Sequence, residues 1–183
     1  MRVVISACLL AAACQPRPLD VIEERAEFPR QALRDDRILL DKLPPDAQTF
    51  SVTFEDQIEL IGGRVTPKNP QPGEEIAVTA YYRVLKPLPE SWKLFVHLDG
   101  VGIANRMHGD HCPCDGRYPT SYWQPKEIVA DTTYISTHGH PRADYIIWTG
   151  FYIDKRRMRV SRADSSRKDK DNRAKIARMT LGQ

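Results

Sequence analysis

The sequence predicts an all-β fold, an antiparallel β-sandwich of the jelly-roll or immunoglobulin-like type with about nine strands. From Phe50 onward, runs of β-branched, aromatic and alternating residues are bounded by Gly, Pro, Asn and Asp. This is the pattern of short strands joined by turns. No stretch has the strand–helix–strand pattern of a βαβ unit, and no repeat of fixed period is visible. A parallel α/β scaffold is therefore disfavoured.

The chain begins with MRVVISACLLAAAC, which has the layout of a secretory signal: one basic residue, a short apolar run, and small residues ending at a cysteine. The run is too short for a transmembrane helix. The closing AAAC resembles the lipobox of bacterial lipoproteins, although Ala11 stands where that motif usually has Leu. The resemblance implies cleavage before Cys14 and lipidation of its thiol, so that acyl chains anchor the protein to a membrane. An ordinary cleaved signal and a misassigned start codon are the alternatives.

The residues after the cysteine extend this prediction. Gln15 stands where Gram-negative lipoproteins kept at the inner membrane have Asp, and by that resemblance we expect an outer membrane lipoprotein facing the periplasm. The next stretch is charged and punctuated by proline, which is typical of a tether and leaves room for a short helix within residues 23–40. We therefore expect a signal peptide at 1–14, a tether at 15–48 and a β-sandwich domain at 49–183.

The candidate strands of that domain are residues 49–54, 58–66, 75–85, 92–98, 102–107, 128–137, 143–153, 157–162 and 173–181. Two of them alternate most clearly, and the residues on one face are Ile76, Val78, Ala80 and Tyr82 in the first and Trp92, Leu94, Val96 and Leu98 in the second. Each of these strands therefore has one side that faces the core. The separators are turn-forming sequences such as NPQPGEE, LDGVG and HGHPR.

Composition agrees with one globular domain. A chain of 183 residues with 41% hydrophobic and 28% charged residues is neither disordered nor an integral membrane protein. The net charge of +3 hides an uneven distribution, because residues 151–183 carry 11 Lys and Arg against 4 Asp and Glu. These cations are interleaved with Asp and turn formers, which favours a solvated surface, and we expect no nucleic-acid partner. Binding of anionic lipid or acidic polysaccharide is the alternative.

A family resemblance rests on the order of several segments: FEDQIELIGGRVTP, PGEEIAVTAYYRV, LFVHLDG, GRYPTSYWQPKEIVADTTY, DYIIWTGFY with RMRV, and DNRAKIARMTL. With these, residues 50–181 resemble the β-sandwich accessory domains found behind bacterial membrane glycosyltransferases and in free-standing lipoproteins. The resemblance implies a binding or structural module without a catalytic motif. The chain departs from the family at Lys126, where the WQPG turn would have Gly.

The segment HGDHCPCDGRYPTSYWQP at 108–125 concentrates the residues that could carry chemistry. One reading is a metal site, in which His108, His111, Cys112 and Cys114 offer imidazoles and thiolates to Zn²⁺ or Cu(I). The CxC spacing differs from the CxxC of zinc knuckles. A second reading is a strained Cys112–Cys114 disulfide, since the other two cysteines lie in the leader. The third is a purely structural loop.

The same segment contains a candidate glycan-binding platform, because Tyr118, Tyr122 and Trp123 could stack on sugar rings if they were exposed; packing in the core is the alternative. Catalytic motifs are missing from the sequence: there is no GxSxG elbow, no HExxH and no Gly-rich phosphate loop. Cys112 with a nearby His is the only conceivable nucleophile pair, and its loop lacks the helix N-terminus that usually lowers a thiol pKa.

These observations favour a non-enzymatic, membrane-tethered binding or structural module of the bacterial cell envelope, without a cofactor, whose partner is an envelope protein or glycan. The alternative from another class is a metal-binding or redox module built on residues 108–115.

Overall fold

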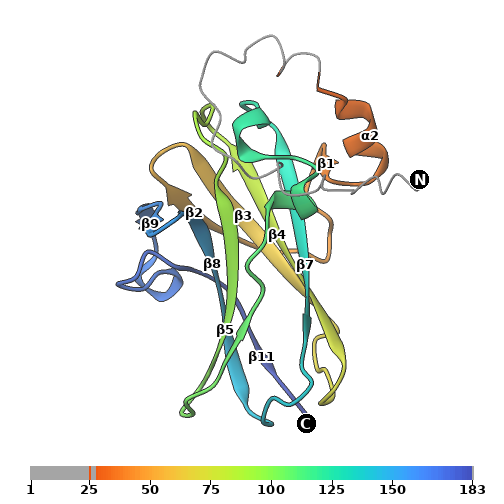
Figure 1. Cartoon of the computed structure of the whole chain (residues 1–183), viewed down its shortest axis with the longest axis vertical. Coiled ribbons are helices and arrows are strands. Elements are labelled where there is room, and N and C mark those ends of the chain that lie inside the picture. Colours follow the sequence, from red (N-terminus) through yellow and green to blue (C-terminus); the bar gives the residue numbers. More distant parts are fainter. Residues whose placement is uncertain (1–24, 26–27, 183) are drawn as a thin grey trace, which may run out of the picture.

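The computed structural model describes Arg25 and residues 28–182, and it confirms the all-β sandwich (Figure 1). In this part of the chain one sheet has the order β1 (Leu39–Leu40), β7 (Ile128–Ser136), β4 (Glu75–Val84), β3 (Ile58–Thr66), β2 (Gln48–Phe54), β10 (Val160–Ala163). The other has the order β11 (Ala174–Thr180), β8 (Asp144–Ile153), β5 (Lys93–Gly100), β6 (Arg106–His108), with β9 (Arg156–Arg157) paired to β8. Every pair of neighbouring strands is antiparallel.

Two of the predicted strands differ from the observed ones. Residues 102–107 were expected to form one strand, but Gly102 adopts φ +74° in a turn and only Arg106–His108 pairs with β5. Residues 157–162 are divided between β9 and β10, which belong to different sheets. The fully buried Met158 lies at this crossing, where the chain passes over the end of the core.

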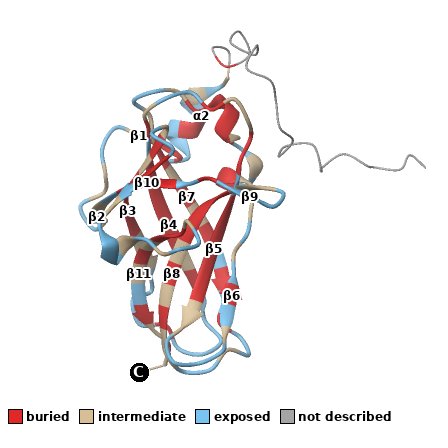
Figure 2. Ribbon diagram, turned by 90° about the vertical axis from the view of Figure 1, so that its left-hand side faces the viewer, coloured by how far each residue is buried: buried red, intermediate tan, exposed pale blue. Residues whose placement is uncertain are grey.

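The core lies between the two sheets, as the predicted alternation required (Figure 2). Ile76, Val78 and Tyr82 of β4 face Leu94 and Leu98 of β5, and all of them are nearly inaccessible to solvent. Burial of one such side chain contributes roughly 1.5–3 kcal/mol of transfer free energy. Both predicted core-facing sides are thus confirmed.

The segment before β2 is part of the folded domain. Helix α2 (Arg30–Asp35), β1 and the turn between them bury Leu33, Ile38 and Leu39 against the sandwich, and β1 extends the six-stranded sheet by pairing with β7. Arg30 also forms an ion pair with Glu127 at 2.9 Å, with both side chains largely buried. The predicted boundary at residue 48 therefore lies too late in the chain, because apolar residues inside the expected tether belong to the core.

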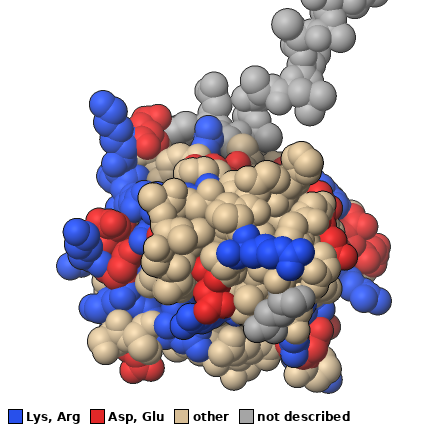
Figure 3. Space-filling model, turned by 90° about the horizontal axis from the view of Figure 1, so that it is seen from below, with Lys and Arg blue, Asp and Glu red and all other residues tan. Residues whose placement is uncertain are grey.

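The leader 1–14, with Cys14, lies outside the described residues. Within the described part, none of the helices combines the length and the apolar character needed to cross a membrane. At the end of the sandwich where the C-terminus lies, acidic and basic side chains are interspersed over the face, and neither sign forms a continuous patch (Figure 3).

Candidate functional site

The segment that the sequence singled out is divided between two faces of the fold. His108 lies opposite His97 in the β5–β6 ladder, and an isolated bridge joins Leu94 to His111. Because side chains alternate along an extended chain, His108 and Asp110 point away from the core while His111 points into it. The structure therefore does not bring His108, His111, Cys112 and Cys114 together in one metal site.

The outward-facing residues form a cluster of their own. One potential ligand atom each from His97, His108 and Asp110 lies within 4.8 Å of the other two. His97 Nε2 is 3.1 Å from Asp110 Oδ1, and the His97 and His108 rings meet edge to face at a centroid distance of 4.9 Å. His97 is buried, whereas His108 and Asp110 are exposed. Two imidazoles and a carboxylate at this spacing can hold a metal ion.

Sequence reasoning missed His97. The only signal was its place in WKLFVHLDG, between the core-facing Val96 and Leu98 and therefore on the opposite face of the strand. Burial lowers the pKa of His97, and the charge of Asp110 offsets part of this effect. The Nδ1 atom of His97 is buried without a hydrogen-bond partner among the described residues.

The inward-facing residues form a buried polar network. His111 Nε2 lies 2.8 Å from Asp131 Oδ2 on β7, and the other Asp131 oxygen accepts a 2.7 Å hydrogen bond from the backbone N–H of Cys114. Burial by itself lowers the pKa of His111, but the hydrogen bond and charge of Asp131 outweigh burial and raise the pKa to about 9. This ion pair joins the two sheets at one edge of the sandwich.

Cys114 is a free, buried thiol, so the predicted Cys112–Cys114 disulfide is not formed. The chain turns sharply here, with Cys114 at φ +53° and Asp115 at φ +55°, and the Cys114 Sγ lies 3.8 Å from the carbonyl oxygen of Ala130. Burial raises the pKa of the Cys114 thiol well above its ordinary value, and the nearby carboxylate of Asp131 adds to this effect. A thiol in this setting stays protonated and is a poor nucleophile.

The glycan-platform hypothesis for Tyr118, Tyr122 and Trp123 is wrong, because all three side chains are buried. Tyr118 Oη donates to Glu127 Oε2 at 2.6 Å, and Trp123 Nε1 donates to the carbonyl oxygen of Tyr118 at 3.0 Å. The rings therefore form the end of the core, and the Tyr118 hydroxyl and the Trp123 N–H are satisfied within the protein.

The basic C-terminal segment is folded against the sandwich, where several of its guanidinium groups cover aromatic rings. Such contacts combine cation–π attraction with burial of the arginine stem. The pairs are Arg156 with Trp92, Arg157 with Phe95, Arg167 with Phe50 and Arg173 with Trp148, at 4.2–4.9 Å from the ring centres.

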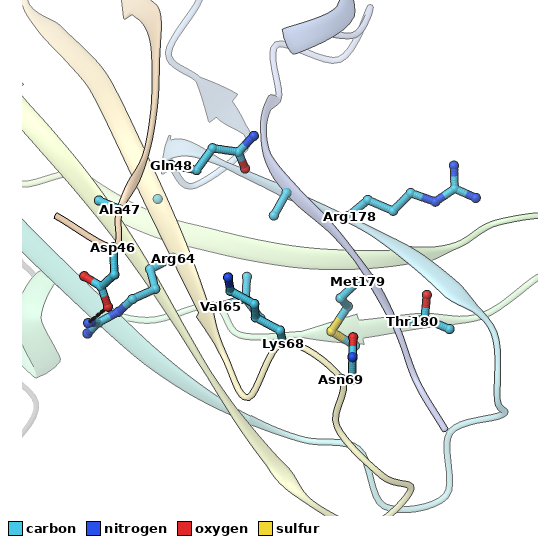
Figure 4. A pocket seen from close by; sticks show the side chains of 12 residues that line it. Asp46, Ala47, Gln48, Arg64, Val65, Lys68, Asn69, Arg178, Met179 and Thr180 are labelled. Atoms are coloured by element: carbon cyan, nitrogen blue, oxygen red, sulfur yellow. Dashed lines mark hydrogen bonds and ion pairs between the residues drawn. The ribbon is translucent and has the colours of Figure 1, made fainter. Parts of the chain in front are cut away.

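A groove of about 650 Å³ lies beside the outer edge of β11 (Figure 4). Its walls are residues 46–48 and 63–65 on one side and residues 177–180 of β11 on the other, with Lys68 and Asn69 at its rim. β11 is the last strand of its sheet, so its backbone has a strand neighbour only on the β8 side.

The direction of the backbone groups follows from two hydrogen bonds at the end of β11. Leu181 N–H donates to Ala143 beside β8, whereas Gly182 N–H donates to Pro70 on the opposite side. Because these directions alternate along a strand, Arg178 and Thr180 point their N–H and C=O groups into the groove. Among the described residues, nothing pairs with these groups.

The groove is predominantly basic, and the stretch of β11 next to it is covered. Arg167 Nη1 donates to the carbonyl oxygens of Lys175 and Ile176, which covers the adjoining stretch of the β11 edge. Three cationic side chains and one carboxylate line the groove: Arg64, Lys68, Arg178 and Asp46. Arg64 is paired with Asp46 at 2.9 Å and Arg178 with Asp144 at 2.5 Å, and Lys68 has no ion pair within the described part of the chain.

No model of a known protein family matches this chain, and no curated protein matches it at a significant level.

Proposed function

We propose that this protein is a non-enzymatic binding module of the bacterial cell envelope that accepts an extended, acidic polypeptide segment as an additional strand beside β11. The observation that supports this most directly is that, within the described part of the chain, the backbone groups of Arg178 and Thr180 at the wall of a groove have no hydrogen-bond partner. Open strand edges readily pair with other chains, and proteins usually cover them. Here the hydrogen bonds from Arg167 cover the edge as far as Ile176, and no other described residue covers the stretch that follows.

The dimensions of the groove suit a short strand. Residues 177–180 extend over about 13 Å, enough for a ligand strand of a few residues to exchange main-chain hydrogen bonds with Arg178 and Thr180. In this binding mode the main chain supplies affinity, and pockets for alternate side chains supply specificity.

The charge of the groove favours an acidic occupant. Lys68 is exposed at the rim, and the cations Arg64 and Arg178 already sit beside carboxylates. A ligand carboxylate would be attracted by all three cations. It would be repelled by one negative charge on the groove walls, that of Asp46. Such attraction weakens as salt is added.

Membrane attachment through Cys14 is the second part of the proposal, and it is supported by the sequence. The AAAC motif resembles a lipobox, and Gln15 favours the outer membrane, which would place the sandwich in the periplasm. The resemblance to accessory domains of membrane glycosyltransferases also favours a tethered module that acts through binding.

The binding test uses a fluorescent peptide of alternating Asp and Val, followed by anisotropy at low salt. We expect Lys68→Glu to weaken binding by about tenfold, since it reverses one charge at the rim. Lys155→Glu is the matched control, because Lys155 is exposed in the turn between β8 and β9. The same peptide N-methylated at alternate residues should not bind, because it cannot donate strand hydrogen bonds.

Unchanged binding of the N-methylated peptide would exclude strand addition. Binding of polygalacturonate without binding of the peptide would move the assignment to an acidic glycan. For the membrane attachment, intact mass of protein from the membrane fraction should show loss of residues 1–13 and acylation of Cys14. A mass without acyl chains, or with Cys14 oxidised to a disulfide, would contradict the anchor.

A further inference from the structure

We propose that His97, His108 and Asp110 bind a divalent transition-metal ion on the outer face of the five-stranded sheet. This site is separate from the groove beside β11, because β11 and β6 form opposite edges of that sheet. It is also separate from Cys112 and Cys114, so its ligands are nitrogen and oxygen atoms.

The spacing of the ligand atoms fits a single ion. Two ligands at about 2.0–2.1 Å from a tetrahedral metal are separated by about 3.3 Å. His97 Nε2 and Asp110 Oδ1 are 3.1 Å apart, which is close to this value before any metal binds. The ligand atom of His108 lies no more than 4.8 Å from the other two ligand atoms. It therefore has to move by about 1.5 Å at most to reach the separation of about 3.3 Å. Because His108 is exposed, rotation of its side chain can supply this movement.

The strands hold the ligands in place. His97 and His108 are direct partners across the β5–β6 ladder, and Asp110 follows on the same side of the chain. Gly109 between them donates a 2.8 Å hydrogen bond to Val96, and a Cβ atom at this position would come within 2.8 Å of Ile135. The missing side chain lets the segment lie against the other sheet, which fixes the directions of His108 and Asp110.

The ligand set selects the class of ion. Imidazole nitrogen favours Zn²⁺, Ni²⁺ and Cu²⁺, whereas Mg²⁺ and Ca²⁺ prefer sites made entirely of oxygen. Three protein ligands leave at least one position for water, and the exposure of His108 and Asp110 gives the ion access from solvent.

The surroundings of His97 set an upper limit on affinity. Metal binding at Nε2 requires the ring proton on Nδ1, which is buried without an acceptor among the described residues. In metal sites, removing the acceptor that binds the second ring N–H of a histidine ligand lowers metal affinity by about 10- to 100-fold. We therefore expect an affinity about 10- to 100-fold below that of a comparable site whose histidine has such a partner.

The test is titration calorimetry with ZnCl₂ and NiCl₂ on the full chain, purified without a polyhistidine tag and dialysed against EDTA. We expect one ion per chain in the wild type and a loss of at least about tenfold in affinity for His108→Ala and Asp110→Asn. Both replaced side chains are exposed, so the fold should be retained. His138→Ala is the matched control, because His138 is exposed in the turn between β7 and β8.

Cobalt substitution gives a second measurement. Co²⁺ bound here should lack the intense near-ultraviolet absorption of thiolate ligation, and Cys114→Ser should leave its spectrum unchanged. Three results would overturn the site: absence of stoichiometric Zn²⁺ or Ni²⁺ binding below millimolar concentration, binding that survives His108→Ala unchanged, or a thiolate spectrum with cobalt.

Discussion

Replacing Asp131 with asparagine should destabilise the protein at neutral pH and leave its stability nearly unchanged at high pH. Asp131 is 2% exposed and accepts hydrogen bonds from His111 and from the backbone of Cys114. Asparagine retains an oxygen for the Cys114 N–H, so the substitution mainly removes the charge that faces the imidazole.

The size of the effect follows from the pKa of His111, which Asp131 raises from 6.5 to about 9 against the opposing effect of burial. A shift of this size corresponds to about 3 kcal/mol of stability, since each pKa unit is worth about 1.4 kcal/mol. Breaking a buried ion pair costs about 3–5 kcal/mol, which agrees. The folded-state pKa is raised, so this stabilisation is complete below pH 6.5 and is lost as the pH rises through 9.

The assay is urea denaturation of the wild type and Asp131→Asn at pH 6 and pH 10, with the free energy of unfolding extrapolated to water. We expect a difference of about 3 kcal/mol at pH 6 and a difference close to zero at pH 10. Asp41→Asn serves as the control, because the Asp41 side chain is 92% exposed. Equal differences at the two pH values would refute a buried imidazolium–carboxylate pair.

Three further predictions concern backbone and packing. Lys126→Gly should stabilise the protein by about 0.5–1 kcal/mol in urea denaturation, because Lys126 adopts φ +76° where glycine is relaxed; lower stability would contradict this. Leu33→Ala should cost about 2–3 kcal/mol, whereas Val101→Ala at a 41% exposed site should change little; equal effects would mean that α2 does not pack on the sandwich. Gly63→Ala should lower the melting temperature, because its Cβ would lie 2.4 Å from Ile176 Cγ2 and overpacking costs about 1–3 kcal/mol; an unchanged melting temperature would argue against that contact.

Local pattern predicted much of the fold. The alternation in residues 75–85 and 92–98 placed the correct faces of β4 and β5 in the core, and the ends of β3 were predicted at Ile58 and Thr66. The expectation of Gly at position 126 also has a physical basis, since Lys126 adopts the left-handed conformation there. The predicted tether extends too far because Leu33 and Leu39 lie among charged residues in the sequence. Only their packing against β7 and the core shows that they are buried.

The sequence by itself determined the strand faces, the turns and the segment richest in reactive side chains, because each depends on residues close together in the chain. Only the tertiary structure decided which residues meet. The register between β5 and β6 places His97 opposite His108, and the alternation along the extended chain after β6 turns His111 toward Asp131 instead. The open edge of β11 depends likewise on which strand ends the sheet. Strand order is set by packing between distant segments. The register of β5 on β6 depends on the geometry of the turn that joins them, which the alternation of apolar and polar residues does not specify.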